Sequence, residues 1–128
     1  MTDPVVNSRI FHVCTRAQAD AALASGEYRA PSLQSEGFIH LSQAHQVQGV
    51  VDRYYANQPG LVVLVVAPQR LRAPLRWEPP AALRVAADAP LPDAAQLFPH
   101  VYGPLNTDAV LEVRDLALFL ASTDGAGA

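Results

Sequence analysis

Two histidines lie inside apolar runs near the start of the chain, and a hydroxyl side chain follows each of them. His12 precedes Thr15 by three residues, and His40 precedes Ser42 by two. A polar ring in an apolar run costs free energy unless it has a partner, so each could simply be a hydrogen-bonded core residue. An imidazole also changes charge near neutral pH, which suits general acid and base catalysis. His12 and His40 are therefore candidate catalytic residues, and Thr15 and Ser42 are candidate ligand-binding residues.

A third candidate catalytic histidine, His100, lies in the compact aromatic segment 98–102. A catalytic carboxylate has few sources, because the chain has only four glutamates: Glu27, Glu36, Glu78 and Glu112. Glu78 follows Trp77, which we expect to be largely buried because a large aromatic ring contributes much to the packing of a small domain. A carboxylate packed on an indole can have its pKa raised, which makes Glu78 a candidate catalytic residue.

Other catalytic centres do not fit the composition or the spacing. The chain has no lysine, which excludes Schiff-base chemistry and a Walker-type phosphate loop. It has no Gly-x-Ser-x-Gly motif of a serine hydrolase. Its single cysteine, Cys14, excludes an intramolecular disulfide and a multi-cysteine zinc site. The four histidines do not form a helical metal-binding pair, so no metal site is predicted.

Length and composition predict one α+β domain. The chain has 128 residues, of which half are apolar, and its net charge of −3 argues against general nucleic-acid binding. We expect the domain to span residues 9–121, with flexible tails at 1–8 and 122–128. No signal peptide or membrane-spanning run is visible, so we expect a cytoplasmic protein without a membrane partner. The oligomeric state stays open.

The elements that position the histidines follow from apolar periodicity and from proline and glycine. Helices are predicted at 16–25 and 43–57. Strands are predicted at 10–14, 38–41, 61–67, 75–78, 83–85 and 109–114. The run 61–67 is apolar throughout and predicts a central strand buried on both faces. We therefore expect a small mixed or antiparallel sheet core with two N-terminal helices, in which His12 and His40 lie on neighbouring strands and the segment 98–105 closes the same cleft.

From about residue 9 to 115 the chain resembles the domain of unknown function 952 family. The resemblance rests on the segments Ile10-Phe11-His12, Ser32-Leu33, Glu36-Gly37-Phe38-Ile39-His40-Leu41-Ser42, Trp77-Glu78 and Phe98-Pro99-His100-Val101-Tyr102-Gly103-Pro104-Leu105. It implies a fold related to that of the ADP-ribosyltransferases, with NAD as the cofactor. In those relatives a His-Gly-Thr or His-Gly-Ser strand end holds the ribose and nicotinamide ends of NAD. Here Val13 and Cys14 replace the glycine.

If this chain binds NAD or an ADP-ribose-like nucleotide, His12 donates to a ribose hydroxyl and Tyr102 stacks on the nicotinamide ring. His100 then serves as the general acid or base, and Glu78 or another carboxylate stabilises the positive charge on the ribose. Glu36 and Tyr102 join the ligand-binding candidates because both lie in the resembling segments.

Two other function classes stay open. One is a non-catalytic module that binds a nucleotide or another small molecule, which the missing glycine favours. The other is a cofactor-free hydrolase or isomerase whose acid and base groups are His12, His40 and His100.

Overall fold

The apolar run that follows Gly60 forms the central strand of the main sheet. The structure is a computed structural model and describes residues 9–79 and 96–126, with side chains described as far as residue 121. Strand β4 (Leu61–Val66) lies between β1 (Ile10–Thr15) and β8 (Val110–Asp115) and runs antiparallel to both. All six residues of β4 are buried. The prediction of a central strand buried on both faces is confirmed.

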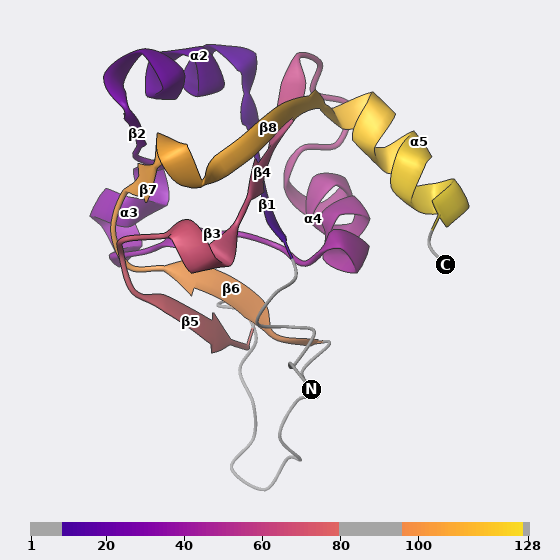
Figure 1. The fold of residues 1–128 in the computed structure, drawn as a ribbon. Coiled ribbons are helices and arrows are strands. Elements are labelled where there is room, and N and C mark those ends of the chain that lie inside the picture. Colours follow the sequence, from indigo (N-terminus) through magenta and orange to yellow (C-terminus); the bar gives the residue numbers. More distant parts are fainter. Residues whose placement is uncertain (1–8, 80–95, 127–128) are drawn as a thin grey trace, which may run out of the picture.

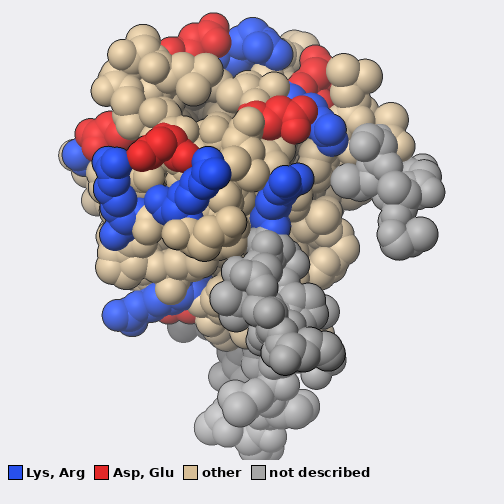
Figure 2. All heavy atoms as spheres, in the orientation of Figure 1, with Lys and Arg blue, Asp and Glu red and all other residues tan. Residues whose placement is uncertain are grey.

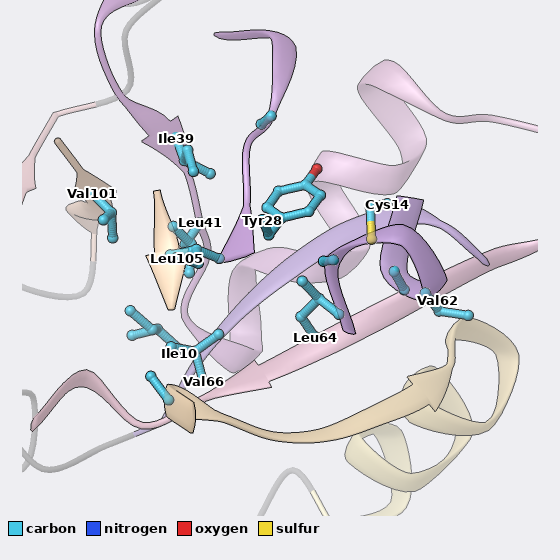
Figure 3. Close-up of a cluster of buried hydrophobic side chains, with 14 residues drawn as sticks. Ile10, Cys14, Tyr28, Ile39, Leu41, Val62, Leu64, Val66, Val101 and Leu105 are labelled. Atoms are coloured by element: carbon cyan, nitrogen blue, oxygen red, sulfur yellow. The ribbon is translucent and has the colours of Figure 1, made fainter. Parts of the chain in front are cut away.

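Alternate residues of β4 pack into two different clusters because successive side chains of a strand point to opposite faces. The even-numbered residues join the larger cluster with Ile10, Cys14 and Tyr28 (Figure 3). Leu61 and Val63 join a second cluster with Val47 and Phe119. The last two residues belong to helices α4 (Val47–Tyr54) and α5 (Leu116–Ala126), which lie on the same side of the main sheet in Figure 1.

Two smaller antiparallel sheets complete the described strands. Strand β2 (Glu27–Tyr28) pairs with β7 (Leu105–Asn106), and β6 (Phe98–Val101) lies between β3 (Ile39–His40) and β5 (Leu75–Glu78). The backbones of Phe11 and Ser42 join β3 to β1 through reciprocal N–H···O bonds of 2.9 and 2.7 Å. This bridge places the strands that carry His12 and His40 side by side, as the sequence predicts.

The N-terminal half contains one more helix than the sequence predicts. Helix α2 (Arg16–Ser25) has the predicted bounds, but α3 (Pro31–Glu36) also forms and α4 ends at Tyr54. A proline at the first position starts α3, and Gly37 ends it in the left-handed conformation with a φ of +92°. The predicted helix 43–57 begins as the 3₁₀ turn η1 (Ala44–Gln46), which contains His45. The expectation of two N-terminal helices was therefore wrong.

Other differences concern the second half of the chain. Trp77 is partly buried and packs against the larger cluster, with more exposure than the residues of the cluster itself. The apolar segment 116–121 lies in α5. The 3₁₀ turns η2 (Pro68–Arg70) and η4 (Thr107–Ala109) complete the described elements. The predicted strand 83–85 and the predicted tail 1–8 lie outside the described residues, and α5 extends over most of the second predicted tail.

Charged side chains of both signs share one face of the molecule. On the face shown in Figure 2, arginines and acidic residues lie interspersed. Three exposed ion pairs of described residues join Arg29 to Glu27, Arg72 to Asp108 and Arg114 to Glu112. Exposed pairs of this kind contribute little to stability. No described helix is long and apolar enough to cross a membrane.

Candidate functional site

His12 is buried on β1 and both of its ring nitrogens are hydrogen-bonded inside the protein. Its Nδ1 lies 2.7 Å from the backbone oxygen of His40, and its Nε2 lies 2.7 Å from the hydroxyl of Tyr28. A carbonyl oxygen only accepts, so Nδ1 carries the proton. In the neutral ring Nε2 then accepts from the Tyr28 hydroxyl. The register of β1 points His12 to the same face as Ile10 and Cys14, toward the larger cluster.

Burial keeps this histidine neutral. It lowers the pKa of His12 to about 4, against the hydrogen bond to His40, which raises it. Burial also raises the pKa of the Tyr28 phenol. At neutral pH the His12–Tyr28 pair is therefore uncharged and satisfied. The expectation that His12 donates to a ribose hydroxyl was wrong, because its one N–H is used by the His40 carbonyl.

The other two candidate histidines face one another across neighbouring strands. His40 of β3 and His100 of β6 are direct partners in the antiparallel pair, and their ring centroids are 5.1 Å apart in an edge-to-face arrangement. Phe38 packs on both, with ring centroids 4.8 Å from His40 and 4.4 Å from His100. The strand register thus holds two imidazoles against one aromatic ring.

A carboxylate orients His100. Its Nδ1 donates to Oε1 of Glu78 at 2.7 Å, and the hydroxyl of Tyr102 donates to the same oxygen at 2.7 Å. Nε2 of His100 has no hydrogen-bond partner within the part of the chain that the structure describes. The ring is thereby fixed in the tautomer that leaves Nε2 able to accept a proton, as in a catalytic carboxylate–histidine pair.

The ionisation of this pair differs from the expectation for Glu78. The hydrogen bond from Tyr102, followed by that from His100, holds the pKa of Glu78 below its ordinary value although burial raises it. The prediction of a raised pKa was therefore wrong. Burial lowers the pKa of His100, and the nearby Glu78 opposes that shift. At neutral pH the pair is an ionised carboxylate next to a neutral imidazole, which is the state of a general base.

His40 has a similar but more exposed partner. Its Nε2 donates to Oε2 of Glu36 at 3.1 Å, and both side chains are more than 40% exposed. Such an exposed contact contributes little to stability. It nevertheless places a second carboxylate beside the histidine pair, on the side open to solvent.

A groove of about 930 Å³ brings most of the candidate residues together. Its described lining includes six of the eight candidates: His12, Thr15, Glu36, His40, Ser42 and His100. Glu78 and Tyr102 are not among these lining residues. Glu78 is connected to the groove by its hydrogen bond to His100, and Tyr102 by its hydrogen bond to Glu78. Thr15 also caps α2, since its hydroxyl accepts from the backbone N–H of Gln18 at 3.1 Å.

Sequence reasoning missed the wall that faces the histidines. Gln46, Gly49, Val50 and Arg53 all line the groove and recur at the spacing of one helical face. Among the described lining residues Arg53 is the only arginine, and it forms no ion pair with any described residue. The apolar periodicity of 43–57 predicts a helix but does not indicate which of its residues face the groove. Tyr28 was missed because nothing local marks it as the partner of His12.

The described residues hold no group of three or more histidine, cysteine or acidic side chains that could bind a metal ion. Cys14 is buried and its pKa is raised to about 11 by burial, so its thiol is protonated at neutral pH. The described residues that line the groove offer imidazole, carboxylate, hydroxyl, amide and guanidinium groups.

Comparison with known proteins identifies relatives of the whole fold. Protein CC0527 from Caulobacter crescentus has a crystal structure that is 30% identical and superposes with a TM-score of 0.68, covering 84% of this chain and 85% of that one. Its solution NMR structure is 31% identical with a TM-score of 0.65, covering 84% of each chain. No curated protein matches this chain. The family described as "Protein of unknown function (DUF952)" matches residues 13–113. This chain therefore belongs to the DUF952 family.

Proposed function

We propose that the protein is a small cytoplasmic enzyme whose groove binds NAD or an ADP-ribose-like nucleotide, with His100 as its general acid or base. The observation that carries the proposal is the Glu78–His100 pair: His100 lines the groove, and its Nε2 has no hydrogen-bond partner among the described residues. A histidine held this way has the geometry of a general base, and its lowered pKa favours the neutral ring that accepts a proton. The resemblance to ADP-ribosyltransferases supplies the class of ligand.

The groove suits a nucleotide in size and in its side chains. Its volume of about 930 Å³ lies within the usual range for small-molecule and cofactor sites. Arg53 supplies a cation for a phosphate group, and the Ser42 hydroxyl is placed to contact a sugar. These residues fit the phosphate and ribose parts of NAD.

NAD supplies a glycosidic bond whose cleavage leaves positive charge on the ribose. Among the described residues Glu36 is the one glutamate that lines the groove, so its carboxylate is placed to favour such charge. Glu78, the glutamate that the sequence favours, is held by Tyr102 and His100 instead. We therefore assign the electrostatic role to Glu36 and the orientation of His100 to Glu78.

A second candidate function is a cofactor-free hydrolase or isomerase. The Glu78–His100 pair favours it, because this pair needs no cofactor to take a proton from water or from a substrate carbon. The non-catalytic binding module differs from both, since it predicts ligand binding that does not depend on the state of His100.

Ligand titration separates these functions. We would follow the melting temperature with NAD, ADP-ribose and AMP, since a ligand at a hundred times its Kd adds about 2.7 kcal/mol of stability. Arg53→Gln should weaken the shift, whereas Arg70→Gln, an exposed arginine outside the described lining, should leave it unchanged. Release of nicotinamide that is lost in His100→Gln would indicate catalysis, and binding without release would indicate the module. No shift with any of the three at millimolar concentration would refute the nucleotide and leave the cofactor-free reaction.

A further inference from the structure

Gly49 is the third residue of helix α4, which continues from the 3₁₀ turn η1, and the fold does not require glycine there. It is exposed, and a Cβ atom built on it would meet nothing within 4 Å. It is not among the described glycines with a positive φ. Glycine in a helix interior is less stable than alanine because it loses more backbone freedom on folding. Neither packing nor backbone conformation therefore explains the glycine.

The position of Gly49 in the groove offers an explanation. It lines the groove between Gln46 and Arg53 on the same face of α4. Without a Cβ atom, the backbone of the helix is open to close approach from the groove. Val50, which also lines the groove, adds an apolar contact at the same level.

The two ends of this helical face differ in chemistry. At one end Gln46 donates from Nε2 to the backbone oxygen of Leu97 at 2.9 Å, next to the strand that carries His100. Near the other end the Tyr55 hydroxyl donates to the backbone oxygen of Val13 at 3.5 Å. Arg53 follows Gln46 by seven residues, roughly 10 Å along a helix that rises 1.5 Å per residue. The groove thus has a histidine end and a cationic end, with Gly49 between them.

We propose that Gly49 is the contact point for a flat ring of an extended, phosphate-bearing ligand. The ring lies against the bare backbone of α4 beside Val50, the phosphate pairs with Arg53 one turn farther on, and the reacting group reaches His40 and His100. This inference rests on the proposed nucleotide function and deepens it. It makes Gly49 a specificity-determining residue, because a side chain at this position would occupy the space that the ring needs.

The test separates stability from binding in the same variants. Gly49→Ala should raise the melting temperature of the free protein by about 2–4 °C, because alanine is the better helix former. The same variant should weaken ADP-ribose binding by about tenfold in isothermal titration, because the added methyl group occupies the space of the ring. Gly49→Leu should weaken it further. Gln48→Leu is the matched control, since Gln48 is the neighbouring residue on α4 but is not among the described lining residues.

Each outcome decides a different question. Stabilised Gly49 variants that lose ADP-ribose while Gln48→Leu retains it would support the contact. Wild-type binding that Gly49→Ala and Gly49→Leu leave unchanged would overturn the inference and keep the proposed function. A Gly49→Ala variant that is less stable than the wild type would also overturn it, because glycine would then serve the fold. Absence of ADP-ribose binding by the wild type would refute the proposed function, and this inference with it.

Discussion

His40 and His100 lie directly opposite one another in the β3–β6 pair, with ring centroids 5.1 Å apart. Each donates a ring N–H to its own glutamate, His40 to Glu36 and His100 to Glu78. Proximity to His40 contributes to the lowered pKa of His100, since two positive charges at this spacing repel. This repulsion adds to the burial that favours the neutral form of His100, which is the form that acts as a base.

The buried His12 should make the fold sensitive to acid. Its pKa falls from 6.5 to about 4 on folding, so the unfolded chain binds the proton more readily. The neutral His12 therefore contributes to the free energy of unfolding above pH 6.5. This stability is lost as the pH falls toward 4, and the loss is about 3 kcal/mol. Urea unfolding between pH 4 and pH 7.5 measures it.

His12→Gln provides the comparison for this pH dependence. It should be less stable at pH 7.5 but should lose less stability on acidification, because the group with the largest shift is gone. Some dependence should remain, since burial also lowers the pKa of His100. An unchanged pH profile in His12→Gln would assign the acid sensitivity to other groups.

Tyr28→Phe should destabilise the protein by about 1–3 kcal/mol, because it leaves the buried Nε2 of His12 without its donor. Tyr54→Phe is the matched control, since Tyr54 is 62% exposed, and it should change stability by less than about 0.5 kcal/mol. Equilibrium urea unfolding at pH 7.5 measures both. Equal stabilities for the two variants would mean that the His12–Tyr28 hydrogen bond contributes nothing.

Glu78→Gln should lower the pKa of His100 further, because the carboxylate favours the protonated ring through a hydrogen bond and through its charge. NMR titration of the imidazole C–H signals measures this shift. Glu36→Gln is the control, since Glu36 contacts His40 and is the weakest of the groups that raise the pKa of His100. A larger shift of His100 in the control than in Glu78→Gln would contradict the orientation of His100 by Glu78.

Gly103→Ala should destabilise the fold by about 1–3 kcal/mol, because the new Cβ would lie 2.7 Å from Cβ of Ala73. The double variant with Ala73→Gly should recover part of this loss, and the four proteins form a double-mutant cycle. Additive effects in urea unfolding would show that the two residues do not clash.

Local patterns were sufficient for part of this fold and for the choice of histidines. The continuous apolar run of β4 predicts its own burial, because only a strand covered on both faces carries so few polar groups. Thr15 and Gly26 predict the two ends of α2, since cap preferences depend on backbone groups within a few residues. The short helix α3 was missed, since six residues are too few for a periodic apolar stripe.

Only the tertiary structure decided what each candidate contacts. The apolar run around His12 is the same whether its Nε2 binds a ligand or Tyr28, so the sequence does not distinguish the two. Tyr28 is placed in part by the pairing of β2 with β7, a strand far along the chain. Whether a carboxylate has a raised or a lowered pKa depends on its neighbours in space, and Tyr102 and His100 reach Glu78 from more than twenty residues away. The sequence names the groups that are able to do chemistry. Their protonation and their partners depend on long-range packing, which residue spacing does not encode.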